Sequence, residues 1–345
     1  MFFYQKLISD FGGFISSMTN IKIKSVEIYL PEKVVHNEYY LEHFKKQDKD
    51  ISNFLKIMGR EKRYLIENNE ENIQTMAIEA VQRVLKKSGL AGHEIDMIIF
   101  STQVPETTVP TNAIFIHHAI NGRKDTIIYD INANCAGMTI AVEQASRYML
   151  SNPHVNTALV VGSDNVSLIS DPTDAMTFAN FGDGAAAVIL EKTEENTGFI
   201  DAMTEVDSSN RNNILYPANG LTEGLKGNGT MDYALWLPFD GSMSIPATCE
   251  MFEKLLERNQ LTIEDVNSFC FSQFALVNIL KIQEHFAIPD EKIVYVGDKY
   301  GYTGTSSPFF ALYEGIESGK IKRGDIIMFW TIGAGHEFIS MLYRY

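Results

Sequence analysis

The chain has 345 residues, of which 44 are acidic and 29 are basic, so its formal net charge at pH 7 is -15. This length exceeds a usual single domain and predicts either two domains or one large duplicated unit. The acidic balance makes nucleic acid a poor partner, because phosphate binding needs a basic face. No apolar run of about 18 residues predicts a membrane span. The three cysteines lack metal-site spacing, so we expect no metal, and a reducing cytoplasm.

Residues 1–20 are predicted to be an N-terminal extension, because their apolar side chains are interrupted by Asp10 and two glycines and lack the basic start of a signal peptide. Helical spacing of apolar residues follows in 73–84, 136–150 and 251–256. Continuous apolar runs predict buried strands at 96–102, 126–131, 158–162, 185–190, 292–296 and 326–330. Strands that are covered on both faces are typical of α/β layering.

An internal repeat joins the two halves of the chain. Residues 90–101 and 261–272 each run from Leu through an acid, a β-branched residue and Asp or Asn to an apolar strand ending in Phe-Ser. In each half, a strand, a turn and a helix come next, and the second turn holds Gly301 and Tyr302. A duplicated α/β unit is therefore predicted, with a first half at 21–195 and a second half at 196–345 that meet in the polar stretch 192–198.

Cys135 occupies the tip of the first-half turn, between a predicted strand and a predicted helix. The dipole and free N–H groups of a helix N-terminus favour the thiolate and can receive an oxyanion. The alternative is that Cys135 is a small buried hydrophobe. Cys249 and Cys270 lie within helical and strand patterns, so we expect both to fill the core.

Several segments resemble ketoacyl-ACP synthase III, a family of the thiolase-like superfamily. They are 134–138 (Asn-Cys-Ala-Gly-Met), 160–165, 171–174, 181–186 and the C-terminal stretch 315–345 with its Gly-Ala-Gly turn at 333–335. The resemblance extends from about residue 21 to the end. It implies a five-layered α-β-α-β-α thiolase fold, usually homodimeric, and a role in fatty acid or polyketide biosynthesis. It also implies that an acyl-CoA or an acyl carrier protein (ACP) acylates Cys135, with no permanently bound cofactor.

Two positions depart from the family pattern. Members that condense with malonyl-ACP use a His and an Asn, where this chain has Ser272 and Tyr302. A serine hydroxyl cannot take a proton at neutral pH as imidazole can, and tyrosine is much bulkier than asparagine. Decarboxylative condensation is therefore in doubt. His336, which follows the Gly-Ala-Gly turn, is a candidate base, and the favoured alternative is that its side chain points into the core or to a dimer surface.

The same resemblance predicts an oxyanion site formed by the N–H groups of Cys135 and Ala334, and a dimer interface in the apolar segment 109–120 with Phe115 and Ile116. Basic residues gather at Lys56, Arg60, Lys62 and Arg63. This cluster is a candidate site for the phosphates of CoA or for a carrier protein, with a solvated surface as the alternative. A carrier protein is the favoured donor.

Three functions remain open. The first is an acyltransferase that passes the acyl group from Cys135 to an amine, hydroxyl or carbon nucleophile. The second is a non-catalytic or supporting subunit of a heteromeric condensing enzyme, paired with a paralogue. The third is an initiating 3-oxoacyl-ACP synthase with an atypical base. Retention of Cys135 in a nucleophile-like turn argues against the second.

Overall fold

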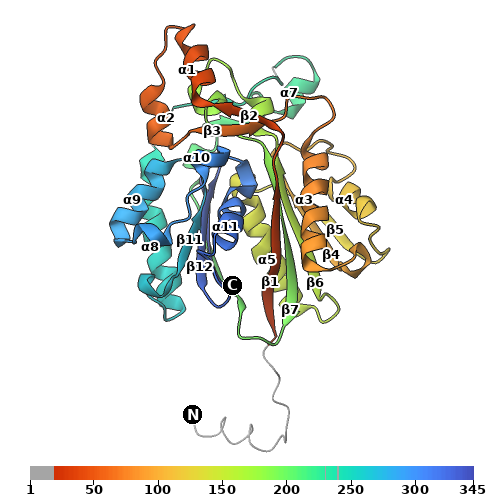
Figure 1. Cartoon of the computed structure of the whole chain (residues 1–345). Helices are drawn as coiled ribbons and strands as arrows, with labels where there is room; N and C mark the ends of the chain where they lie inside the picture. The colour runs from red at the N-terminus through yellow and green to blue at the C-terminus, as the bar shows by residue number, and fades with distance from the viewer. Residues whose placement is uncertain (1–18, 230, 239–240) are drawn as a thin grey trace, which may run out of the picture.

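The computed structural model describes residues 19–229, 231–238 and 241–345. All but the last two residues of the predicted N-terminal extension lie outside the described residues. Two sheets stand side by side, with helices between them and on both outer faces (Figure 1). Among the described residues, no helix combines the length and the apolar character that crossing a bilayer requires.

The first sheet has five strands in the order β1 (Asn20–Tyr29), β7 (Gly184–Thr193), β6 (Thr157–Asp164), β4 (Met97–Ser101) and β5 (Ile127–Ile131). Strand β4 pairs in parallel with β5 and β6, whereas β7 runs antiparallel to β6 and β1. Every residue of β4 and β6 is buried, as expected for strands covered on both faces. Four of the predicted strands are confirmed here.

The second sheet has four strands in the order β11 (Ser268–Phe271), β12 (Ile326–Gly333), β13 (Glu337–Arg344) and β8 (Gly198–Val206). The predicted strand at 326–330 is confirmed as β12. The predicted strand at 292–296 is wrong, because of these residues only Ile293 forms a bridge, to Phe269 of β11. The N–H groups of Val296 and Gly297 donate to the side-chain oxygen of Gln273 instead of to a neighbouring strand.

Two helices fill the space between the sheets, α5 (Gly137–Ser151) and α11 (Ser307–Glu317), and belong to the central core. On the outer face of the first sheet, α3 (Ile73–Ser88) and α4 (Ala113–Ala119) pack in a second core. On the outer face of the second sheet, α8 (Ser244–Arg258) and α9 (Leu276–Phe286) pack in a third. The predicted α-β-α-β-α layering is confirmed, as are the three predicted helices (Figure 1).

Smaller elements lie above the sheets in Figure 1 and cover the carboxyl ends of the parallel strands. They include a hairpin of two strands and five short helices: β2 (Lys33–His36), β3 (Lys62–Leu65), α1 (Asn37–Lys45), α2 (Ser52–Met58), α6 (Ala175–Phe178), α7 (Leu221–Leu225) and α10 (Gly297–Tyr300). A two-stranded ribbon, β9 (Ile214–Leu215) with β10 (Leu235–Trp236), completes this cap.

The two halves use matching local structure. One short 3₁₀ turn precedes β4 (Gly92–Glu94) and another precedes β11 (Ile263–Asp265). A 3₁₀ turn also begins each central helix: η2 (Asn134–Ala136) leads into α5, and η8 (Gly304–Ser306) leads into α11. These pairs follow the order of the sequence repeat.

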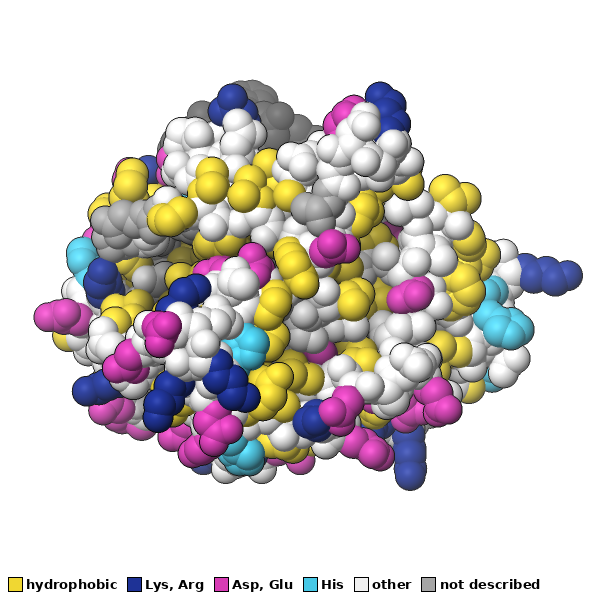
Figure 2. Space-filling view, turned by 90° about the horizontal axis from the view of Figure 1, so that it is seen from above, with side chains coloured by type: hydrophobic (Ala, Val, Ile, Leu, Met, Phe, Trp, Pro, Cys, Tyr) yellow, Lys and Arg dark blue, Asp and Glu magenta, His cyan; other side chains and the backbone are white. Residues whose placement is uncertain are grey.

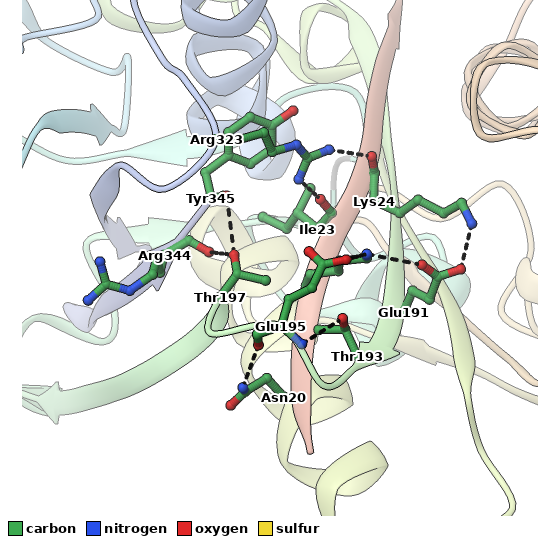
Figure 3. Close-up of polar contacts among 11 residues, drawn as sticks. Asn20, Ile23, Lys24, Glu191, Thr193, Glu195, Thr197, Arg323, Arg344 and Tyr345 are labelled. Atoms are coloured by element: carbon green, nitrogen blue, oxygen red, sulfur yellow. Dashed lines mark hydrogen bonds and ion pairs between the residues drawn. The ribbon is translucent and has the colours of Figure 1, made fainter. Parts of the chain in front are cut away.

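The two sheets are tied together at the end opposite the cap (Figure 3). The Arg323 guanidinium donates to the backbone oxygens of Ile23 (2.6 Å) and Lys24 (2.8 Å) and lies over the Tyr345 ring at 3.9 Å. The Thr197 hydroxyl, in the β7–β8 connection, donates to the backbone oxygen of Arg344 at 2.8 Å. The connection between the halves, β1 and the C-terminus therefore form one cluster.

Candidate active site

Three parallel strands end at one edge of the first sheet. Register pairs Ser101 of β4 with Ile131 of β5 and Gly162 of β6, so the residues that follow lie together. The carboxyl edge of a parallel sheet is the usual place for ligands. Cys135 follows β5 at this edge, on the 3₁₀ turn that begins α5, as predicted from the sequence.

The turn that carries Cys135 is held tightly. Asn134 has φ 51, a left-handed conformation that asparagine tolerates better than most residues. A Cβ on Gly137 would lie 2.4 Å from the Ser101 hydroxyl oxygen, so only glycine fits there. The Thr331 hydroxyl donates to the backbone oxygen of Cys135 at 3.2 Å. The sulfur therefore has a fixed position at the start of the central helix.

Cys135 lines a pocket of ≈ 590 Å³ between the cap and the sheet edges. Its walls are mostly apolar and come from α2, the cap ribbon and α9; they include Phe54, Ile57, Met58, Met176, Ile214, Trp236, Val277 and Ile332. On the face seen from above, hydrophobic side chains lie exposed among the charged ones (Figure 2). The pocket suits a largely apolar guest that reaches Cys135.

Four aromatic rings surround the thiol side of the pocket. Trp236 stacks on Phe274 with ring centres 5.5 Å apart, and Phe274 meets Tyr302 edge-on at 5.1 Å. Phe181 packs on Tyr302 at 6.0 Å, and these residues form one apolar cluster with Cys135. Sequence patterns did not indicate this ring cluster, because its members are far apart in the chain.

Burial decides the ionisation of Cys135. Desolvation, followed by the negative charge of Asp164, raises the pKa of the Cys135 thiol to about 11. The nearby Tyr302 phenol and the backbone N–H groups of Cys135 and Ala334, which stabilise the thiolate, oppose this rise and are outweighed. The N–H groups favour the thiolate, as expected from the sequence, but the desolvation of the buried sulfur has the larger effect on its pKa.

The structure brings Ser272 and Tyr302 to the same place as Cys135. Burial first, and then the proximity of Cys135, raise the pKa of Tyr302 well above its ordinary value, while Ser272 opposes that rise. Both hydroxyl groups are buried, and the Tyr302 phenol interacts with the Cys135 sulfur and with the Ser272 hydroxyl. A phenol of such high pKa can donate a hydrogen bond, but neither group can act as a base near neutral pH.

Ala334 lies in the turn between β12 and β13, across from the Cys135 turn. Asn134 donates to its backbone oxygen at 3.4 Å. The N–H groups of Ala334 and Cys135 both lie near enough to the sulfur to lower the pKa of the thiol. This is where the predicted oxyanion site requires them, and their role in binding an oxyanion stays a prediction.

His336 lines the same pocket, in a left-handed conformation with φ 61. Its Nδ1 faces the Asn210 side-chain nitrogen at 3.3 Å, while the Asn210 oxygen accepts from Asn213 at 3.2 Å. Because an amide nitrogen only donates, Nδ1 accepts and the ring proton lies on Nε2. The Nδ1 atom is therefore engaged by Asn210, and the role of His336 as a base stays a prediction.

The predicted cluster of basic residues does not form a basic surface, because its two arginines are buried. Arg60 is 3% exposed and Arg63 is 0% exposed, whereas Lys56 stays on the surface. The Arg60 guanidinium donates to the backbone oxygens of Gln273, Phe274, Asn180 and Gly297.

Arg63 donates to Asn37 and to the backbone oxygen of Ala179, and it lies over the Tyr40 ring. The prediction that Arg60 and Arg63 bind the phosphates of the acyl donor at the surface is therefore wrong, because both guanidinium groups are buried and donate hydrogen bonds to backbone carbonyl oxygens.

Two polar residues beside Cys135 were missed from sequence. Gln103 follows β4, and Asp164 ends β6, at the same sheet edge. The signal that identifies them is their position directly after buried parallel strands, which only becomes informative once the strand order is known. Cys249 and Cys270 are buried in the helix and strand that were predicted for them.

Comparisons with known proteins match this arrangement. Residues 129–208 match the family described as 3-Oxoacyl-[acyl-carrier-protein (ACP)] synthase III, and residues 256–345 match its C-terminal part. A beta-ketoacyl-[acyl-carrier-protein] synthase III of Solibacter usitatus is 31% identical over 95% of this chain and 99% of its own length. That of Ehrlichia canis is 30% identical over 93% and 98%.

Solved structures agree in fold. The 3-oxoacyl-[acyl-carrier-protein] synthase III of Aquifex aeolicus VF5 superposes with a TM-score of 0.82 at 26% identity, over 94% of this chain and 100% of that one. The priming β-ketosynthase of the R1128 polyketide pathway has a TM-score of 0.85 at 21% identity, over 96% and 98%. The second likeness shows the fold alone.

The raised pKa of Cys135 gives a pH prediction. Its alkylation by iodoacetamide should accelerate with pH, with a logarithmic slope of one and no plateau up to pH 10, because about a thousandth of a thiol of pKa about 11 is ionised at pH 8. Tyr302→Phe removes a group that lowers this pKa, so it should slow alkylation at each pH. Rates are read by mass spectrometry of the Cys135 peptide.

Tyr300→Phe is the matched control, because the Tyr300 phenol donates to Glu314 instead. A wild-type rate that levels off below pH 10, as expected for a thiol of ordinary pKa, contradicts the prediction.

Proposed function

The chain belongs to the 3-oxoacyl-[acyl-carrier-protein] synthase III family and is an acyltransferase, and from this premise we propose that Cys135 carries the acyl group. The observation that supports this residue is its place in the pocket. Of the three cysteines, all of which are described, only Cys135 lines the pocket, whereas Cys249 and Cys270 are buried. The three thiols are free, which fits a reducing cytoplasm as the proposed location.

Loading of Cys135 needs no net deprotonation. The Cys135 sulfur forms a bond to the carbonyl carbon of a thioester, the donor's carbon–sulfur bond breaks, and the thiol proton ends on the departing thiol. The carbonyl oxygen carries negative charge in between, and the N–H groups of Cys135 and Ala334 would hold it there. A thiol of raised pKa is a slow nucleophile on its own, so these donors carry much of the catalysis in this proposal.

The proposed donor is an acyl-ACP or an acyl-CoA, whose phosphopantetheine arm would enter the pocket of ≈ 590 Å³. Its apolar walls suit an acyl chain. Lys281 of α9 lines the pocket, and Lys56 lies on the neighbouring α2, so these exposed lysines replace Arg60 and Arg63 as the proposed phosphate contacts. No permanently bound cofactor is proposed.

The proposed second step transfers the acyl group from Cys135 to an amine, hydroxyl or carbon nucleophile without loss of CO₂. Decarboxylation of a malonyl thioester leaves an enolate, and each hydrogen-bond donor aimed at such an oxyanion is typically worth about a hundredfold to a thousandfold in rate. The family positions for these donors hold Ser272 and Tyr302, whose hydroxyl groups are buried, and the raised pKa of Tyr302 makes its phenol a weaker donor. An activated acyl group needs no enolate to be transferred.

We also propose a homodimer. Strand β5 forms one edge of the first sheet, has no second strand partner among the described residues, and is only half-buried. Unpaired edges are normally covered. In the neighbouring segment 109–120, Val109 is 87% exposed and Ile114 is exposed. Ile116 packs into the core and is therefore withdrawn from the proposed interface, while the half-buried Phe115 remains.

Self-acylation is the direct test of Cys135. Incubation with a suitable acyl-CoA or acyl-ACP should add one acyl mass per chain in intact-mass spectrometry, and Cys135→Ala should abolish it. Cys249→Ala and Cys270→Ala are the controls and should load normally. An acyl group that maps to another residue, or that persists in Cys135→Ala, contradicts the proposal that Cys135 carries the acyl group.

Release of labelled CO₂ from malonyl-ACP tests the reaction type. We expect wild type to release it at least about a hundredfold more slowly than the Solibacter usitatus relative, because both family donors are replaced. His336→Ala is measured beside it. Rapid release by wild type overturns the proposal, and loss of that release in His336→Ala would make the chain an initiating synthase with an atypical base.

Light scattering tests the assembly. The mass should be twice the 38.8 kDa of one chain, and Val109→Asp combined with Ile114→Asp should lower it, because a charge at a buried interface is unfavourable. Leu280→Asp, at an exposed position of α9, is the matched control. A monomer at every concentration refutes the homodimer, and a complex seen only with a paralogue favours a supporting subunit.

A further inference from the structure

The Gln103 side chain connects the Cys135 thiol to a buried carboxylate. The thiol donates to Gln103 Oε1 at 3.5 Å, and Gln103 Nε2 donates to Asp164 Oδ2 at 2.9 Å. We propose that Gln103 is a positioning residue for acyl transfer, which holds the Cys135 thiol in one orientation because Asp164 fixes its amide. This inference rests on the proposed role of Cys135 as the acyl carrier.

The chemistry of the three groups determines which way the amide points. A carboxylate only accepts hydrogen bonds, so the amide nitrogen must face Asp164. The amide oxygen then faces Cys135, where it can accept from the thiol and cannot donate to a thiolate. A glutamine without a carboxylate partner is free to turn its amide around, so Asp164 supplies the direction.

Asp164 is itself held in place. Besides Nε2, its two oxygens accept from the Gln103 N–H (2.8 Å), the Thr102 hydroxyl (3.0 Å) and the Thr305 N–H (2.8 Å). Burial raises the pKa of the Asp164 carboxyl, and these four donors oppose that rise because they stabilise the ionised form. Thr305 belongs to the second half of the chain, so both halves fix this group.

The backbone at Gly304 closes over the contact between Asp164 and Gln103. A Cβ on Gly304 would lie 2.1 Å from Asp164 Oδ2 and 2.8 Å from Gln103 Nε2, and its φ of +62 lies in the left-handed region. Only glycine satisfies both conditions. The amide and the carboxylate are therefore packed into one rigid arrangement behind the thiol.

The consequence for Cys135 is directional. With its S–H bond aimed at Gln103, the sulfur lone pairs point away from Gln103. The hydrogen bond also stabilises the neutral thiol, so the proton stays on sulfur until the thioester is in place. The other titratable groups that face the sulfur are Asp164 and Tyr302, and His336 lines the same pocket.

Gln103→Met tests the thiol contact, because it keeps the length of the side chain and removes both the amide oxygen that accepts from Cys135 and the amide nitrogen that donates to Asp164. Without an acceptor, the neutral thiol loses its stabilisation, so alkylation of Cys135 by iodoacetamide at pH 8 should rise about threefold to tenfold. Loading by an acyl thioester should instead fall about tenfold in kcat with little change in KM, because the sulfur is no longer oriented. A general loosening of the pocket would not raise the alkylation rate while it lowers the loading rate.

Asp164→Asn tests the source of the direction. An asparagine that presents its amide nitrogen to Gln103 makes the Gln103 amide turn, so that Nε2 donates to the sulfur. The thiolate is then stabilised by this donor and also by the loss of the Asp164 charge, so alkylation at pH 8 should exceed that of Gln103→Met. The folded state of each variant is checked by circular dichroism. If Asp164→Asn does not fold, Gln103→Met alone decides the proposal.

Gln283→Met, on α9 with contacts to Ile288 and Asp290, is the matched control and should change neither reaction. Unchanged alkylation and loading in Gln103→Met overturn the proposal, as does a parallel change of the same sign in both. Alkylation needs no acyl donor, so it reports the Gln103 contact even when wild type fails to load. Failure to load wild type overturns the proposed function instead.

Discussion

The two central helices begin against each other, and the position of the nucleophile depends on that contact. The Thr305 hydroxyl oxygen accepts from the Met138 N–H at 2.7 Å and lies 2.9 Å from the Ser101 hydroxyl oxygen. Gly137 leaves no space for a side chain at the same junction. Thr305 comes from the second half of the chain, whereas Met138 follows Cys135 in the first. The start of α5 therefore cannot shift without moving α11, so the core, and not the cap, sets where the sulfur lies.

Burial raises the pKa of the Cys135 thiol, hydrogen bonding lowers it, and the effect of burial is the larger. A rise of the Cys135 pKa from 9.0 to about 11 corresponds to roughly 2 to 3 kcal/mol against ionisation. The N–H groups of Cys135 and Ala334 act in the other direction, yet aromatic and aliphatic walls exclude the water that a thiolate needs. The apolar pocket that suits the proposed acyl group thus makes Cys135, the proposed nucleophile, harder to ionise. Thioester exchange tolerates this, because one thiol enters the reaction and another leaves.

Local patterns predicted most of the fold and the position of Cys135, because buried strands, amphipathic helices and a strand–turn–helix tip are recognisable within a few residues. The errors come from side chains that act over long sequence distances. The strand at 292–296 fails because the Gln273 side chain takes the N–H groups of Val296 and Gly297. Arg60 looked like a surface charge until the fold brought buried carbonyls to it. Gln103 and Asp164 are 61 residues apart and meet only through the order of three parallel strands.

Arg60 links the two positions that depart from the family pattern, Ser272 and Tyr302, into one structural unit. Its guanidinium holds the backbone oxygens of Gln273 and Phe274, which follow Ser272, and that of Asn180. Asn180 in turn accepts from the Tyr302 N–H at 3.1 Å, so one buried cation fixes the wall on which Ser272 and the Tyr302 ring sit. An imidazole placed at Ser272 would still meet the Tyr302 ring, packed edge-on against Phe274. The wall beside Cys135 is thus filled by the Tyr302 side chain, which is anchored from both halves. Recovery of the decarboxylation that we propose to be lost would therefore require this wall to be rebuilt as a unit.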